Sequence, residues 1–255
     1  MSFKLTILGC GSSVGSPRID GYWGKCKKKE KNIRTRCSAI INKGSNAVLI
    51  DASPDIRKQF LSNKIKNISS VLITHKHADQ THGLFELRPF FWKYNKKINI
   101  YSDPTTIKYL QNNQKYLFKE TDGYVPILKG NTVKKEFSLG KSKDKINIKS
   151  ISAKHGNIKS IIYVFSKTAY ISDCNDLSIV NFDILKNLNY LILDCLKFDK
   201  HPSHFNLDEA LYVIKLLKPK KTILTNLHYD LDYDFLISKL PKNVLPAYDG
   251  LKINL

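Results

Sequence analysis

The stretch Val71-Leu72-Ile73-Thr74-His75-Lys76-His77-Ala78-Asp79 decides how this chain folds. Its first four residues are apolar or β-branched and predict a buried strand, and the polar residues lie at the end of that strand. If the strand continues, residues two apart point to the same side, so the imidazoles of His75 and His77 converge. Asp79 adds a carboxylate where the chain turns into a helix. Two imidazoles and a carboxylate grouped in this way predict a metal site.

Further candidate ligands follow other predicted strands. His155 comes after a strand at 146–151, Asp173 after one at 169–172, and His228 after one at 222–225. Loops at strand ends on one rim are where active sites are usually built. We therefore expect one cluster that binds two divalent ions, with Asp173 between them. Its members are His75, His77, Asp79, His155, Asp173 and His228.

Apolar and β-branched runs predict strands along the whole chain. We expect them at 4–8, 38–41, 48–51, 71–74, 98–101, 146–151, 161–165, 169–172, 190–194 and 222–225. Helices are expected at 54–61, with Ser53 as N-cap and Pro54 first, and at 207–217 after Asn206. Paired early strands followed by strands that alternate with helices predict an α/β fold of two sheets covered by outer helices, not a singly wound parallel sheet. With no linker or repeat to divide it, 1–255 is expected to form one domain.

The composition indicates a globular protein. Of its 255 residues 42% are hydrophobic, and no apolar run reaches the roughly 18 residues of a membrane helix. The apolar stretch at the N-terminus is too short for the core of a signal peptide, so we expect a cytoplasmic location. The five cysteines form no C-x-x-C pair, which indicates neither a disulfide framework nor a zinc ribbon.

The charge is strongly positive. Lys and Arg number 42 and Asp and Glu 22, which gives a net charge of +20. Such an excess attracts small anions and polyanions. Lys heavily outnumbers Arg, however, so a biased composition also explains much of it, and the densest run, 25–36, has no aromatic residue for base stacking. A nucleic-acid partner therefore stays open, as does a homodimer.

The chain resembles the metallo-β-lactamase-fold hydrolases along its whole length. The matching motifs are Leu8-Gly9-Cys10-Gly11, Thr74-His75-Lys76-His77-Ala78-Asp79, His155-Gly156, Ser172-Asp173, His228 and Tyr248-Asp249-Gly250. Within the superfamily it looks most like the phosphoribosyl cyclic phosphate phosphodiesterases, through 81–88 and 204–210, and tRNase Z is more distant. The resemblance implies an αββα sandwich of two packed mixed β-sheets flanked by helices, with the metals between the sheet edges. It implies that one ion is held by His75, His77 and His155. It implies that Asp79 and His228 hold the second ion and that Asp173 bridges the two.

Position 80 departs from the superfamily's pattern. There H-x-H-x-D is followed by a histidine that binds the second ion, whereas this chain has Gln80. A neutral amide oxygen is a harder and poorer ligand than imidazole. We therefore expect a second site that binds its ion more weakly and prefers Mn²⁺ or Fe²⁺ over Zn²⁺ more than an imidazole site would. His82 is a less favoured substitute because it lies about 4.5 Å farther along a helix axis than Asp79.

The resemblance implies a metal-dependent phosphodiesterase that acts on a small anionic substrate, a cyclic phosphate being favoured. A metal-bound hydroxide would attack the phosphorus. Asp79 is expected to take part in catalysis. His204, two residues before the helix start at Asn206, is expected to donate a proton or to stabilise the transition state. Arg88 is expected to hold a phosphate oxygen, with a surface salt bridge as the alternative.

Two other functions stay open. The positive charge favours an RNA-processing nuclease of the tRNase Z kind, but such enzymes typically carry an arm between the positions of His155 and Asp173. Residues 156–172 are too few for more than two strands and a turn. The other alternative is a non-catalytic, nucleic-acid-binding protein that has lost its second ion through Gln80.

Overall fold

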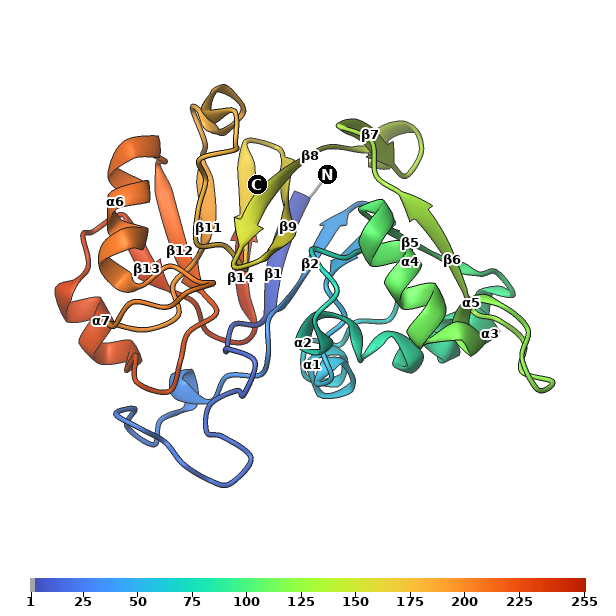
Figure 1. The fold of residues 1–255 in the computed structure, drawn as a ribbon, viewed down its shortest axis with the longest axis horizontal. Helices are drawn as coiled ribbons and strands as arrows, with labels where there is room; N and C mark the ends of the chain where they lie inside the picture. Colours follow the sequence, from blue (N-terminus) through green and yellow to red (C-terminus); the bar gives the residue numbers. More distant parts are fainter. Residues whose placement is uncertain (1–2) are drawn as a thin grey trace.

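The computed structural model describes residues 3–255. Two β-sheets of seven strands pack against each other, and helices lie on the outer face of each sheet (Figure 1). This arrangement confirms the αββα sandwich expected from the sequence. Within the described residues, no helix is both long enough and apolar enough to cross a membrane.

The first sheet is built from the N-terminal half of the chain and one C-terminal strand. In spatial order it contains β14 (Leu251–Asn254), β1 (Phe3–Gly9), β2 (Ser38–Lys43), β3 (Asn46–Ile50), β4 (Ser70–Leu72), β5 (Ile98–Ser102) and β6 (Leu128–Thr132). Pairs from β14 to β3 are antiparallel, and pairs from β3 to β6 are parallel. Every residue of β3 and β4 is buried, as expected for central strands covered on both faces.

The second sheet repeats this plan with later segments. In spatial order it contains β13 (Val244–Pro246), β12 (Lys221–Thr225), β11 (Tyr190–Asp194), β10 (Thr168–Ile171), β9 (Ile158–Phe165), β8 (Ile146–His155) and β7 (Glu136–Leu139). Pairs from β13 to β10 are parallel, and pairs from β10 to β7 are antiparallel. Each sheet therefore joins an antiparallel half to a parallel half.

Helices cover the outer faces in the order of the chain. They are α1 (Ile56–Ser62), α2 (Ala78–Thr81), α3 (Arg88–Tyr94), α4 (Pro104–Asn113), α5 (Lys115–Phe118), α6 (Leu207–Leu217) and α7 (Tyr233–Lys239), with 3₁₀ turns at Glu30–Asn32, Leu84–Leu87, Ser142–Asp144 and Phe182–Leu185. Helix α6 begins with a capping box, in which Asn206 and Glu209 each accept the other's backbone amide. Its buried residues recur at helical spacing and face β11 and β12.

Apolar side chains form a core between each pair of layers. Leu5 of the first sheet and Tyr163 of the second belong to the core between the sheets. Leu49 and Ile107 belong to the core under α1 and α4, and Leu193 to the core under α6 and α7. Strands with both faces covered in this way leave their polar ends at the rim, where catalytic side chains can gather.

The strands that the sequence missed lie at the sheet edges. They are β6, β7, β13 and β14, the outermost strands of the two sheets. Edge strands are short and carry residues that a central strand avoids, such as Gly130 in β6 and Pro246 in β13. The helix expected at 54–61 begins at Ile56, and Ser53 is not its N-cap, because Ser53 Oγ accepts the amide of Asp55 two residues on, in a turn.

The Arg34 side chain connects the basic segment 25–36, which precedes β2, to the loop 226–232, which follows β12. The side chain is buried, with 2% of the residue exposed. Its guanidinium donates to the backbone oxygens of His228 (3.1 Å) and Leu231 (2.7 Å) and to the Asn32 side-chain oxygen (2.9 Å). One planar group therefore holds two segments that are far apart in the sequence.

Replacing Arg34 with methionine is expected to lower the free energy of unfolding by about 3 kcal/mol or more, because three acceptors lose a donor worth about 1–3 kcal/mol each. Urea denaturation measures the change. The control is Lys28→Met in the same segment, where the side chain is exposed, and we expect it to stay within about 0.5 kcal/mol of the native protein. Equal midpoints for the two variants would contradict this role of Arg34.

Candidate metal centre and active site

His75 and His77 lie on the loop between β4 and α2. The strand ends at Leu72, two residues before the predicted end, because the Thr74 amide donates to the Asp51 carboxylate (2.8 Å) instead of continuing a β-ladder. The imidazoles converge all the same, with His75 Nε2 2.9 Å from His77 Nδ1. The loop, and not strand alternation, brings the two rings together.

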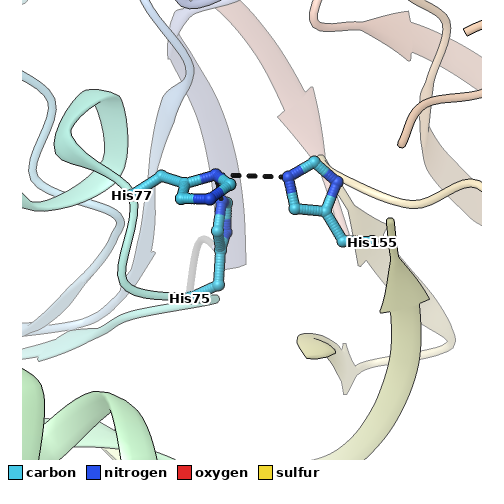
Figure 2. A group of neighbouring side chains, drawn as sticks. All are labelled: His75, His77 and His155. Carbon is cyan, nitrogen blue, oxygen red and sulfur yellow. Dashed lines mark hydrogen bonds between the residues drawn. The ribbon is translucent and has the colours of Figure 1, made fainter. Parts of the chain in front are cut away.

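His155 reaches the same point from the second sheet. It is the last residue of β8, and 156–157 form the tight turn into β9, where Gly156 takes a positive φ of 57°. Glycine at the first position of a two-residue hairpin loop favours that conformation. His155 Nε2 lies 3.3 Å from His77 Nδ1, and Figure 2 shows the three imidazoles facing one another. We call His75, His77 and His155 the three-histidine site.

The nitrogen spacing of the three-histidine site fits a divalent metal ion. Bonds of about 2.0–2.1 Å at tetrahedral angles place ligand nitrogens about 3.3–3.4 Å apart. The two closest approaches, 2.9 and 3.3 Å, are near that value. Burial lowers the pKa of His75 to about 3 and lowers that of His77, so both rings are neutral at pH 7, as metal binding requires.

Neighbouring groups hold two of the rings in the ligating orientation. His155 Nδ1 lies 2.7 Å from the Ser203 carbonyl oxygen, which accepts its proton and leaves Nε2 free to bind an ion. His75 Nδ1 lies 3.0 Å from Thr74 Oγ1, and that hydroxyl lies 3.0–3.1 Å from the two Asp51 carboxyl oxygens. The Ser203 carbonyl oxygen therefore assigns the Nε2 lone pair of His155 to the site, and Thr74 holds the orientation of the His75 ring.

Asp173, Asp79 and Gln80 form a second group beside the imidazoles. Gln80 is fully buried on α2 and donates from Nε2 to one oxygen of Asp79 and one of Asp173, both at 3.2 Å. Burial, and then the charge of Asp173, raise the pKa of Asp79 to about 6. Burial acts to raise the pKa of Asp173 too, but His75 and His204 hold it below the usual value.

His204 lies against this group just before α6. Its Nδ1 is 2.8 Å from Asp194 Oδ2 and 4.0 Å from Asp173 Oδ1, and its ring packs on His155 with centroids 4.7 Å apart. Burial lowers the pKa of His204, but the charge and hydrogen bond of Asp194, with help from Asp173, outweigh burial and raise it to about 9. His204 is therefore protonated at neutral pH.

Asp194 and Asn226 belong to the site although the sequence analysis did not select them. Asp194 ends β11, so the strand-end signal that selected Asp173 applies to it equally. Asn226, 2% exposed, follows β12 and donates from Nδ2 to Asp194 Oδ1 (3.1 Å) and Asp173 Oδ1 (3.3 Å). A neutral amide that follows an apolar strand does not by itself indicate a metal ligand. The sequence therefore predicts the nearby His228 as a ligand and gives no role to Asn226.

His228, Arg88 and His82 lie away from the buried ligand atoms. His228 Nδ1 is 3.0 Å from Asp230 Oδ2, and its ring lies on Tyr229 with centroids 3.6 Å apart. His228 still lines the cleft that Asp79 and His204 line. Arg88 lines a different cleft, beside Tyr124, so the structure does not bring it to the site as expected. His82 is exposed at the end of α2.

A cleft of about 550 Å³ opens over Asp79 and His204. Three cationic residues line it, Arg18, Arg36 and Lys197. Arg18 is paired with Asp20, and Arg36 with Asp55 at 2.9 Å. A volume of this size suits a small molecule, and the cations favour an anionic one.

Two sequence comparisons connect the chain to known proteins. A model described as the beta-lactamase superfamily domain matches residues 46–229. An octanoyltransferase of Porphyromonas gingivalis (strain ATCC BAA-308 / W83) is 28% identical over 255 residues, which cover 98% of this chain and 51% of that protein. The chain thus spans about half the length of this curated relative.

Solved structures repeat the same fold. A new diphosphatase from the PhnP family has a TM-score of 0.89 and 28% identity, covering 100% of this chain and 98% of its own. The short form of human tRNase Z has a TM-score of 0.69 and 18% identity, covering 98% of each chain, and shows the fold alone. Since the family model spans most of the chain and all of the three-histidine site, this chain belongs to the beta-lactamase superfamily and has the metallo-β-lactamase fold.

Proposed function

We propose that the protein hydrolyses a phosphodiester bond in a small anionic substrate. The observation that carries this proposal is His204, held by Asp194 next to the three-histidine site and open to a cleft lined by cations. A fixed, protonated imidazole beside a metal site suits a reaction in which an oxygen leaves and needs a proton.

The three-histidine site fits a divalent ion in its nitrogen spacing and in the neutral state of the His75 and His77 rings. When bound, such an ion supplies Lewis acidity and an acidified water as nucleophile. Asp79, which lines the cleft and has a pKa of about 6, accepts a proton from the attacking water. His204 donates a proton to the departing oxygen, and Arg18, Arg36 and Lys197 attract the phosphate oxygens to the cleft.

The size of the cleft and the short connection between β9 and β10 favour a small substrate over tRNA. Only Ser166 and Lys167 join these two strands, so no arm extends from this part of the chain. The diphosphatase similarity supports a phosphate ester or anhydride as the substrate class. We favour a cyclic phosphodiester, as the resemblance implies, hydrolysed with Zn²⁺ or Mn²⁺.

The chemistry of the cysteines does not favour the octanoyl transfer named for the Porphyromonas gingivalis relative. A thiol nucleophile needs an accessible thiolate. All five cysteines are buried, and burial raises the pKa of Cys10 and Cys37 well above the usual value. Acyl transfer through a cysteine thiolate is therefore not proposed here.

We expect the purified protein to hold at least one divalent ion per chain and to hydrolyse bis-p-nitrophenyl phosphate. Dialysis against a chelator should remove both the ion and the activity, and Mn²⁺ or Zn²⁺ should restore them. Metal analysis and the colour of released nitrophenol are the measurements. A panel of cyclic phosphates, diphosphates and tRNA precursors then identifies the substrate class.

Two results would contradict this function. Protein never exposed to chelator that holds well under half an equivalent of metal, and gains none, would remove the metal mechanism. Metal-poor, inert protein that retards RNA in a gel would favour the non-catalytic alternative.

A further inference from the structure

Two buried amides flank the Asp173 carboxylate, one on each oxygen. Gln80 Nε2 lies 3.2 Å from Asp173 Oδ2, and Asn226 Nδ2 lies 3.3 Å from Asp173 Oδ1. Both side chains are almost completely buried, at 0% and 2% exposed. The carboxylate that the sequence analysis expected between two ions therefore meets a neutral donor on each side.

The partners of each amide fix which of its atoms faces the carboxylates. Gln80 Nε2 also meets Asp79 Oδ2 (3.2 Å), and Asn226 Nδ2 also meets Asp194 Oδ1 (3.1 Å) and the Ser172 carbonyl oxygen (3.1 Å). Turning either amide over would set an oxygen against the oxygens of two carboxylates, so the nitrogen side of each amide faces them. Asn226 Nδ2 also lies 3.1 Å from His204 Nδ1. An N–H₂ group has no lone pair for a cation, so the side of each amide that faces the carboxylates offers no ligand. Gln80 Oε1 is buried without a hydrogen-bond partner.

His228 does not make up for the missing ligands. Its Nδ1 is engaged by Asp230, which leaves Nε2 free, but His228 belongs to neither described group of three close ligand atoms. The described groups of close ligand atoms are His75, His77 and His155 on one side and His155, Asp173 and His204 on the other. Of these two groups, the first consists of three imidazoles whose closest nitrogen contacts have a spacing suited to an ion.

We propose that the protein is a one-ion enzyme, in which the amides of Gln80 and Asn226 take the place of a second ion beside Asp173. This inference rests on the proposed function and makes it more specific, because it assigns the hydrolysis to a single ion. The amides hold Asp79 and Asp173 in place by hydrogen bonds, as a cation would by coordination. Asp79 thus stays available as a proton acceptor instead of being a ligand.

Metal stoichiometry tests the proposal without reference to activity. Native protein equilibrated by dialysis with Zn²⁺ or Mn²⁺ is expected to hold one ion per chain, with any second ion at least about 100-fold weaker. The Mn²⁺-loaded protein should give the electron paramagnetic resonance spectrum of an isolated ion. Two ions of similar affinity, or the spectrum of an exchange-coupled pair, would overturn the proposal whatever the variants do.

The double variant Gln80→His/Asn226→His supplies imidazoles on both sides of Asp173. We expect it to bind a second ion about 10-fold to 100-fold more tightly than the native protein does. Asn112→His, at an exposed amide on α4, is the matched control and should keep the native stoichiometry. His228→Ala should also keep it, and loss of an ion in that variant would restore His228 as a ligand and refute the proposal.

Failure of this proposal is distinguishable from failure of the proposed function. A native protein that binds two ions and hydrolyses phosphodiesters keeps the function and loses the one-ion centre. A protein that binds one ion and hydrolyses none of the phosphate panel keeps the centre and loses the function.

Discussion

Replacing His77 with alanine is expected to weaken binding of the metal ion by about two to three orders of magnitude. A site of four ligands is worth about 10–16 kcal/mol, so one ligand contributes about 2.5–4 kcal/mol. His77 is the best of the three histidines to replace because its side chain is exposed, whereas His75 and His155 are buried, and the variant should fold. Hydrolysis should fall with metal occupancy, since the ion supplies the nucleophile.

Competition with a chromophoric chelator measures the affinity, and circular dichroism verifies the fold. The matched control is His82→Ala, which removes an exposed imidazole five positions along the chain and should leave the affinity unchanged. If His77→Ala binds the ion as tightly as His82→Ala does, the three imidazoles are not the ligand set.

Replacing His204 with alanine is expected to lower kcat by about 10²–10⁴ without loss of the ion, the usual worth of a positioned proton donor. The loss should shrink for an activated aryl ester, because a good leaving group departs without a proton. Asp194 holds the ring at 2.8 Å, so alanine at position 204 removes a donor that is already oriented. Steady-state kinetics on esters with different leaving groups measures the effect.

His201→Ala is the control for this second prediction. His201 lines the same cleft and its ring lies 5.1 Å from that of His204, but its Nδ1 contacts only Ser203 nearby. A much smaller change in kcat is expected. An equal loss of rate on activated and unactivated esters in His204→Ala would exclude the role as proton donor.

The sequence predicts the interior of this fold better than its edges. β11 and α6 match their predicted ranges because apolar runs and a capping residue mark their ends. β6 and β13 were missed because an edge strand needs no buried pattern, and its pairing depends on a neighbour that is distant in the sequence. β-Propensity depends strongly on such a neighbour.

The candidate ligands show the same division. Imidazoles are common metal ligands, so residue type and position after a strand were enough to predict His75, His77 and His155. Asn226 and Asp194 act through their position beside Asp173 and His204, which only the folded chain reveals. Arg88 was expected from its side chain alone, and the fold directs it to another cleft.

The three-histidine site also has a consequence for the lifetime of the protein. His77 and His155 are 78 positions apart in the chain and come from different sheets, so an ion held by both acts as a cross-link that closes a long loop. An ion at about 1,000 times its dissociation constant adds about 4 kcal/mol to stability. Loss of such an ion would therefore raise the unfolded fraction about a thousandfold, and in a cell starved of metal the protein would be exposed to proteases.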